Sequence, residues 1–215
     1  KTTVDETVDE RNEPLPQSVR DFADAVDCIE EVVASETDGR LHQYDVRLDS
    51  GERALVKTVA PGVDVDDEAE SAFTRVTRQW HGASTHSTVA TLFDSGLDPR
   101  PWVAVEASDW RLTDVLDDLS LDQRVGVLVD ATDALHMTRM YNVSHRHLRP
   151  SCLWVTDGAD RLEARVHWNV ERLLVGDADA VTPYTAPEQL EAESGSVGRH
   201  TDVYQLGAVA YHVFT

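Results

Sequence analysis

Lysine is almost missing from this chain. Only Lys1 and Lys57 are lysines, whereas the chain has 40 Asp and Glu residues and a formal net charge of −21. Such a density of carboxylates holds water and cations at high salt, where most Coulomb repulsion is screened, so the composition is typical of a halophile's protein. The alternative is an acidic protein that binds basic partners. The charge argues against nucleic acid as a partner, because phosphates would be repelled.

Cysteines and long apolar runs are also scarce. Cys28 and Cys152 show no paired spacing, which argues against a disulfide framework and fits a reducing cytoplasm. No apolar run is long enough to span a bilayer, and no signal-peptide pattern opens the chain. We therefore expect a cytoplasmic protein without a membrane segment. The chain begins at Lys1 and stops inside an apolar helical pattern, which indicates a piece of a longer protein.

The order of the predicted elements favours an α+β protein with two lobes. Residues 1–20 are polar and acidic and predict a linker or a disordered arm. Alternating segments predict strands at 28–33, 44–48, 53–59, 89–93, 102–105, 153–155 and 164–168. Periodic segments predict helices at 66–80, 112–116, 121–140 and from near 202. In the longest helix, the residues that recur at helical spacing are Val125, Leu128, Val129, Thr132, Leu135 and His136.

Several short segments carry known patterns in a fixed order. They are Ala54-Leu55-Val56-Lys57, His86-Ser87-Thr88-Val89, His145 to Leu153, His167-Trp168-Asn169, Thr185-Ala186-Pro187-Glu188 and Thr201 to Gly207. They resemble, in the same order, six features of the eukaryotic-type Ser/Thr protein kinases. These are the VAIK strand, the HPNIV segment after the C helix, the HRDLKPxNI catalytic loop, DFG, APE and the start of the F helix. The resemblance covers roughly residues 28–215.

The resemblance implies a bilobal protein-kinase-like fold. Residues 21–105 would form a β-rich N-lobe with five strands, and residues 106–215 a mostly helical C-lobe that is truncated after the start of helix F. The hinge that meets the nucleotide would fall at Glu106 and Ala107, with Val105 as gatekeeper. Lys57 would meet the α- and β-phosphates of ATP. ATP and Mg²⁺ are the cofactors that the resemblance implies.

The chemical positions of the resemblance are all changed. His147 stands in the place of the catalytic Asp, Cys152 in that of the loop Asn, and His167 in that of the DFG Asp. An imidazole lacks the negative charge of the catalytic carboxylate, and neither thiol nor imidazole is a good ligand for hard Mg²⁺. The three substitutions predict that catalysis is lost and only the fold remains.

The nucleotide-binding features are incomplete as well. Residues 34–39 take the place of the glycine-rich loop, yet Gly39 is their only glycine and the acidic Glu36 would repel a triphosphate. The C-helix position that should pair with Lys57 falls on Val76 or Thr77. The sequence therefore predicts weak or absent ATP binding.

Four further residues have structural roles by resemblance. His145 is expected in the core, and Asp202 as a buried acid that binds the catalytic-loop backbone. Arg146, whose family role is to bind a phosphate on the activation loop, is expected to bond a nearby carboxylate instead. Glu188 belongs to the APE segment, and its family partner would lie beyond Thr215.

Three functions remain open at this point. The first is a pseudokinase that signals or scaffolds through a protein partner. The second is a divergent but active Ser/Thr kinase that uses His147 as the base and acts on a protein substrate. The third is a soft-metal site, with Zn²⁺ held by His147, Cys152 and His167, which the fold would bring together.

Overall fold

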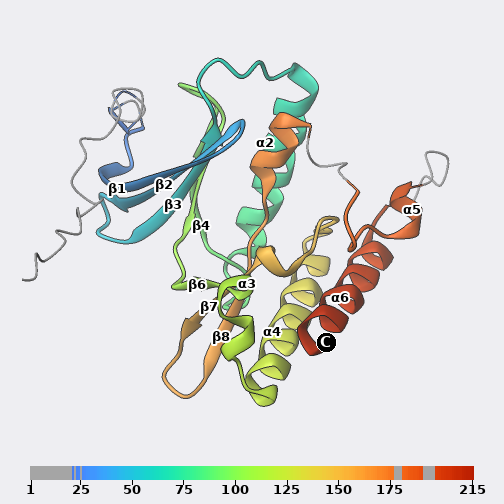
Figure 1. The fold of residues 1–215 in the computed structure, drawn as a ribbon. Coiled ribbons are helices and arrows are strands. Elements are labelled where there is room, and N and C mark those ends of the chain that lie inside the picture. Colours follow the sequence, from blue (N-terminus) through green and yellow to red (C-terminus); the bar gives the residue numbers. More distant parts are fainter. Residues whose placement is uncertain (1–20, 22, 25, 177–180, 191–196) are drawn as a thin grey trace, which may run out of the picture.

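The computed structural model describes residues 21, 23–24, 26–176, 181–190 and 197–215 (Figure 1). The arm predicted for residues 1–20 lies outside the described residues. The chain forms a β-rich N-terminal part and a mostly helical C-terminal part, which confirms the α+β prediction. Figure 1 shows the large sheet beside helix α2 (Asp67–Ala83), with α4 (Leu121–Met140) and α6 (Arg199–Phe214) in the lower half of the view.

The N-terminal sheet has five antiparallel strands in the order β1-β2-β3-β5-β4. Successive side chains of a strand point to opposite faces. On β3, Ala54 and Val56 join one apolar cluster, whereas Leu55 and Val59 join the larger core. Lys57 shares the parity of the second pair, so β3 directs it to the side of the larger core. The strands are β1 (Ile29–Asp38), β2 (Leu41–Leu48), β3 (Arg53–Val59), β4 (Leu92–Gly96) and β5 (Trp102–Glu106).

Of the predicted strands only β3 keeps its bounds, and β1 and β4 depart from theirs most. β1 runs through residues 34–38, where we expected a loop, and the turn shrinks to Gly39 and Arg40. Gly39 has a φ of 58°, a left-handed conformation that costs glycine little. The strand predicted at 89–93 begins only at Leu92. The preceding backbone bonds elsewhere, because the N–H of Ala90 donates to the C=O of Val166, a residue of the second sheet.

Helix α2 is fixed at its start and along its buried side. Asp66 caps it by accepting the backbone N–H of Ala69 at 2.8 Å. Trp80 is fully buried, and its indole Nε1 donates to the C=O of Ala90 at 2.9 Å. These contacts hold α2 against the chain that leads into β4.

Helix α4 has its predicted bounds but buries a different face. Val125 and Val129, whose spacing indicated the helix, are 46% and 52% exposed. Long-range partners choose the buried face instead, since Asp130 binds Arg161 of another segment through two hydrogen bonds. The buried residues are Val127, Asp130, Ala131, Ala134 and Thr138.

A small second sheet and several short helices complete the C-terminal part. No helix among the described ranges combines the length and apolar character needed to cross a membrane. The sheet has the order β6-β7-β8. Its strands are β6 (Trp110–Arg111), β7 (Leu153–Asp157) and β8 (Leu162–Val166), and the short helices are α3 (Leu112–Val115), η2 (Leu116–Asp118), η3 (Pro150–Cys152), η4 (Val170–Val175) and α5 (Pro187–Leu190).

Candidate functional site

The candidate catalytic loop is held from below by α6. The Asp202 carboxylate accepts the backbone N–H groups of His145 at 2.9 Å and Arg146 at 2.6 Å. Gln205, one turn further, accepts the N–H of Leu148 and donates to the C=O of Arg146, both at 2.8 Å. Arg146 has a φ of 65°, which costs free energy for a non-glycine residue and persists where the surroundings enforce it. This contact is made by the backbone of Arg146, so the carboxylate expected for its guanidinium stays a prediction.

Burial sets the charge of the residues behind the loop. His145 is buried, its Nε2 lies 3.0 Å from the C=O of His167, and its ring packs on Trp168 at 4.7 Å between centroids. Desolvation lowers the pKa of His145 and so favours the neutral imidazole. Burial also raises the pKa of Asp202, although the two backbone N–H groups that it accepts act in the opposite direction. The loop is therefore anchored by a mostly buried carboxyl group that receives two donors.

The residue in the DFG Asp place is a buried, neutral histidine. His167 has no exposed surface, and its ring stacks on Trp154 at 5.1 Å between centroids. Burial, and then the positive charge of Lys57, hold its pKa well below the ordinary value. Among the described residues, neither ring nitrogen has a hydrogen-bond partner. This side chain supplies no negative charge to the cleft.

The other two chemical positions are equally unsuited to magnesium. Cys152 is fully buried, burial raises its thiol pKa, and the thiol lies 3.4 Å from the C=O of His147. The amide of Asn169 approaches the same sulfur at 3.3 Å. Mg²⁺ prefers carboxylate and other oxygen ligands, whereas these places present a neutral thiol and imidazoles. The residues present do not fit Mg²⁺.

The zinc site predicted from His147, Cys152 and His167 is not formed. In the described part of the chain, no three His, Cys, Asp or Glu side chains are grouped so that they could hold a metal ion. The His167 ring is packed against Trp154, and the Cys152 thiol faces a backbone carbonyl. The fold does bring these residues close, since the N–H of His167 donates to the C=O of Cys152 at 2.9 Å, but in the described part of the chain their side chains are not grouped as metal ligands.

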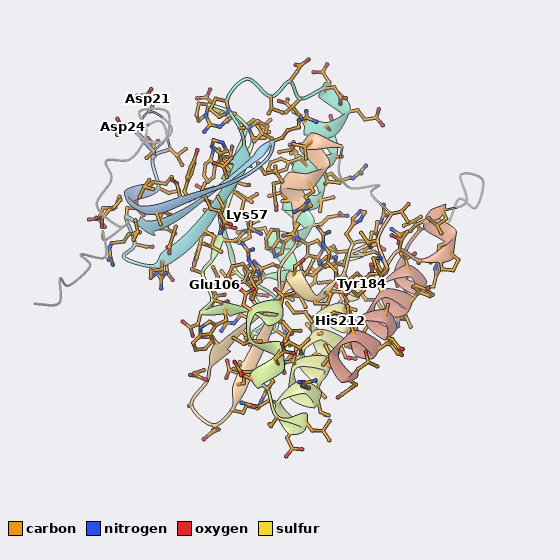
Figure 2. All side chains as sticks on the ribbon, viewed as in Figure 1. Asp21, Asp24, Lys57, Glu106, Tyr184 and His212 are labelled. Carbon is orange, nitrogen blue, oxygen red and sulfur yellow. The ribbon has the colours of Figure 1, made fainter. Side chains whose placement is uncertain are left out.

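Lys57 contacts two residues that lie outside α2. Its ammonium donates to the side-chain Oδ1 of Asn169 at 2.9 Å and lies 3.7 Å from the Oε1 of Glu171. The side chains of Lys57 and Glu171 are 7% and 8% exposed. A buried charge requires a counter-ion, and Glu171 of η4 is the acid that pairs with Lys57 in place of a residue of α2. Lys57 and Glu106 are labelled in Figure 2, at the sheet and at its junction with the helical part.

The hinge residues are engaged within the chain. The Glu106 carboxylate accepts the side-chain hydroxyl of Thr91 at 2.9 Å and forms an ion pair with Arg165. The backbone N–H of Ala107 donates to the C=O of Arg53 at 3.4 Å. Val105, the expected gatekeeper, is fully buried. The polar groups of Glu106 and Ala107 that these contacts use are therefore not free for an adenine ring.

Glu188 has partners within the described residues. Thr201 donates its hydroxyl to the Glu188 carboxylate at 2.6 Å, and His200 lies 3.4 Å from the same oxygen. The hydrogen bond from Thr201 is the main reason why the pKa of Glu188 is lowered. Near this junction, Tyr184 and His212 meet edge to face, with ring centroids 6.1 Å apart (Figure 2). The segment around α5 is thus docked on α6.

Glu171 was not expected from the sequence to be the counter-ion of Lys57. One signal was present: Lys57 is the only lysine after Lys1, it lies in a strand with apolar neighbours, and the expected α2 position carries no acid. A buried lysine must then pair elsewhere, and Glu171 is the first acid after the His167-Trp168-Asn169 segment. Its three-dimensional proximity could not be obtained from spacing.

Known proteins with a similar sequence are serine/threonine-protein kinases. PknB of Mycobacterium tuberculosis is 25% identical over 151 residues, which cover 62% of this chain and 24% of PknB. PknB of Mycobacterium leprae is 25% identical and PknB of Mycolicibacterium smegmatis 23% identical over the same length. This chain spans about a quarter of the length of these curated relatives. No protein-family profile matches it. Together with the α+β architecture, the similarity supports a protein-kinase-like domain.

Proposed function

We propose that this protein is a pseudokinase, a protein-kinase-like domain that signals or scaffolds through a protein partner and does not transfer phosphate. The observation that carries the proposal is the neutral, buried state of His167 in the DFG Asp place. Phosphoryl transfer depends on metal ions that neutralise the phosphates, and a carboxylate at this place holds them. Cys152 and His147 leave the neighbouring places without a carboxylate as well. Loss of charge stabilisation alone raises the barrier by on the order of several kcal/mol.

Weak or absent ATP binding belongs to the same proposal. Lys57 is already paired with Glu171 and Asn169. The Ala107 N–H at the hinge is bonded to Arg53. A nucleotide would have to replace these internal contacts, and only the surplus of its own contacts would appear as affinity.

The partner and the setting follow from charge and cysteine chemistry. A net charge of −21 favours a protein partner over nucleic acid, because phosphates would be repelled. Cys28 and Cys152 are both free thiols, which fits a reducing cytoplasm. High intracellular salt would screen the acidic surface, as in a halophile.

The test is a phosphotransfer assay of the full-length chain with labelled ATP, Mg²⁺ or Mn²⁺ and a generic protein substrate in molar KCl. We expect no incorporation above that of the Lys57→Ala variant, which controls for a contaminating kinase. Incorporation by the wild type that is lost in both Lys57→Ala and His147→Ala would overturn the proposal. That result would establish a divergent active kinase with His147 as the base.

A further inference from the structure

Helix η4 fills the space beside Lys57 with the chain's own side chains. It lies against α2, β2 and β3, and Figure 1 shows its orange coil alongside α2. Val170, Leu174 and Val175 are 2%, 3% and 6% exposed and belong to the same core as residues of β2 and β3. A 3-10 helix of six residues is unusually long, and such stretches often mark a hinge or a sequence under strain.

Two polar contacts connect η4 to the N-terminal sheet. Glu171 is the counter-ion of Lys57 on β3, at 3.7 Å. At the other end of η4, the guanidinium of Arg40 donates to the C=O of Val175 at 3.0 Å. Arg40 follows Gly39 in the turn between β1 and β2, so this hydrogen bond connects the β1–β2 hairpin to η4. Gly176 then ends the helix with a φ of 72°.

A third contact ties the same hairpin to β6. Glu36 on β1 pairs with Arg111 on β6 at 3.7 Å. The Arg111 guanidinium lies over the ring of Trp154 at 5.2 Å. The β1–β2 hairpin is therefore tied both to η4 and to β6.

One oxygen of Glu171 lacks a partner in the part of the chain that the structure describes. Its Oε2 is buried and accepts no hydrogen bond from the described residues, while Oε1 lies 3.7 Å from the Lys57 ammonium. A half-satisfied buried carboxylate is costly, so this contact is a weak point of an otherwise apolar segment. The pair holds while no other anion reaches Lys57.

We propose that η4 is a built-in plug of the Lys57 pocket, in which the Glu171 carboxylate occupies the place of a phosphoryl anion. The plug rests on the proposed pseudokinase function and gives it a regulated state. When η4 leaves, Lys57 becomes a site for the phosphates of a nucleotide, and binding requires no Mg²⁺ because the metal places carry no carboxylate. Whatever displaces η4 also releases Arg40 and the β1–β2 hairpin.

The test compares Glu171→Gln with a matched control, Glu31→Gln, in the full-length chain. Both variants remove one negative charge from an ion pair of 3.7 Å, but the Glu31 pair with Arg47 is exposed. ATP binding is measured by calorimetry in molar KCl with a metal chelator, and hydrogen exchange is followed at the amides of residues 170–176. In Glu171→Gln we expect ATP to bind at least about tenfold more tightly and the η4 amides to exchange at least about tenfold faster, because the closed population falls.

The controls separate the plug from a general charge effect. Glu31→Gln should bind ATP within about twofold of the wild type. Adding Lys57→Met to Glu171→Gln should abolish the gained affinity. The plug is wrong if Glu171→Gln keeps the wild-type ATP affinity and the wild-type protection of η4, and also if the wild type already binds ATP as tightly as the variant.

A second variant covers the case in which Glu171→Gln does not fold. Arg40→Gln removes the guanidinium tie to Val175 on an exposed turn and leaves the Lys57 pair intact. It should speed exchange at the end of η4 and raise ATP affinity by a smaller factor, whereas unchanged exchange would contradict the plug. Phosphotransfer by the wild type would overturn the pseudokinase function without deciding the exchange result, so the two failures can be told apart.

Discussion

The carboxylate of Asp202 accepts the backbone N–H of Arg146 at 2.6 Å and holds that residue at a φ of 65°. We expect Asp202→Ala to lower the free energy of unfolding by about 2–5 kcal/mol, because one buried and one partly buried N–H group lose their acceptor. Asp202→Asn should cost about 1–3 kcal/mol, since its amide can accept one N–H but turns a donor toward the other. Chemical denaturation measures both values.

A substitution one turn further along α6 is a second test of how α6 holds the loop. Gln205→Glu would place an acceptor opposite the C=O of Arg146, which now receives the Gln205 amide at 2.8 Å. This variant should lower the free energy of unfolding by about 1–3 kcal/mol, because the same loop loses a hydrogen bond. If Asp202→Ala changes stability by less than about 0.5 kcal/mol, the carboxylate does not hold the loop.

Stability should fall as the pH drops below the ordinary imidazole pKa of 6.5. The folded-state pKa of His167 is lowered well below that value, so the unfolded chain takes up a proton at a pH where the folded chain does not. The free energy of unfolding then decreases by up to about 1.4 kcal/mol per pH unit for this group, and the loss continues down to the folded-state pKa. Urea denaturation between about pH 7 and about pH 5 measures the slope.

His167→Phe is the matched variant for the pH slope. A phenyl ring can keep the contact with Trp154 and removes two buried nitrogens that lack partners. The variant should be at least as stable as the wild type at neutral pH and should have a shallower slope below it. Asp202 acts in the opposite direction, because its raised pKa lets the folded chain take up a proton first, but it is common to both proteins. Equal slopes in the two proteins would contradict a neutral buried His167.

Molar KCl should raise the melting temperature of the protein. With 40 acidic against 19 basic side chains, the excess carboxylates repel one another strongly when the Debye length is about 30 Å at 0.01 M salt and much less when it is about 3 Å at 1 M. A gain of a few kcal/mol would correspond to roughly 5–10 °C for a chain of this size. Calorimetry across a KCl series measures it. A melting temperature that stays flat over the series would remove the support for a halophilic origin.

Arg161→Met should cost more stability than its exposure suggests. Asp130 is 3% exposed, and Arg161 donates to both of its carboxylate oxygens at 2.7 and 2.8 Å. Without Arg161 the buried carboxylate keeps only the N–H of Ala164, so we expect a loss of about 2–4 kcal/mol. Asp130→Asn should cost about 1–2 kcal/mol, because the half-exposed guanidinium can turn to water. The reverse order in denaturation experiments would contradict this account.

Local patterns were sufficient for most of the elements and for the residue types at the three chemical positions. The bounds of β3 and α4 follow from alternation and from helical spacing, and Asp66 marks the start of α2. These features depend on neighbours in the chain, and periodicity records them directly. The residue types at positions 147, 152 and 167 are likewise visible without a structure, because they are read directly from the sequence.

Only the tertiary structure decided which faces are buried and which distant residues are in contact. The buried face of α4 was set by the distant Arg161, and the start of β4 by backbone bonds to Val166. Glu171 became the partner of Lys57 because η4 packs under β3, a contact between segments far apart in sequence. The sequence by itself determined a kinase-like α+β pattern without its catalytic carboxylates, since residue types and short periods are local. The partners of Lys57 were decided by folding, since burial makes each charged group pair with whichever partner packing brings near.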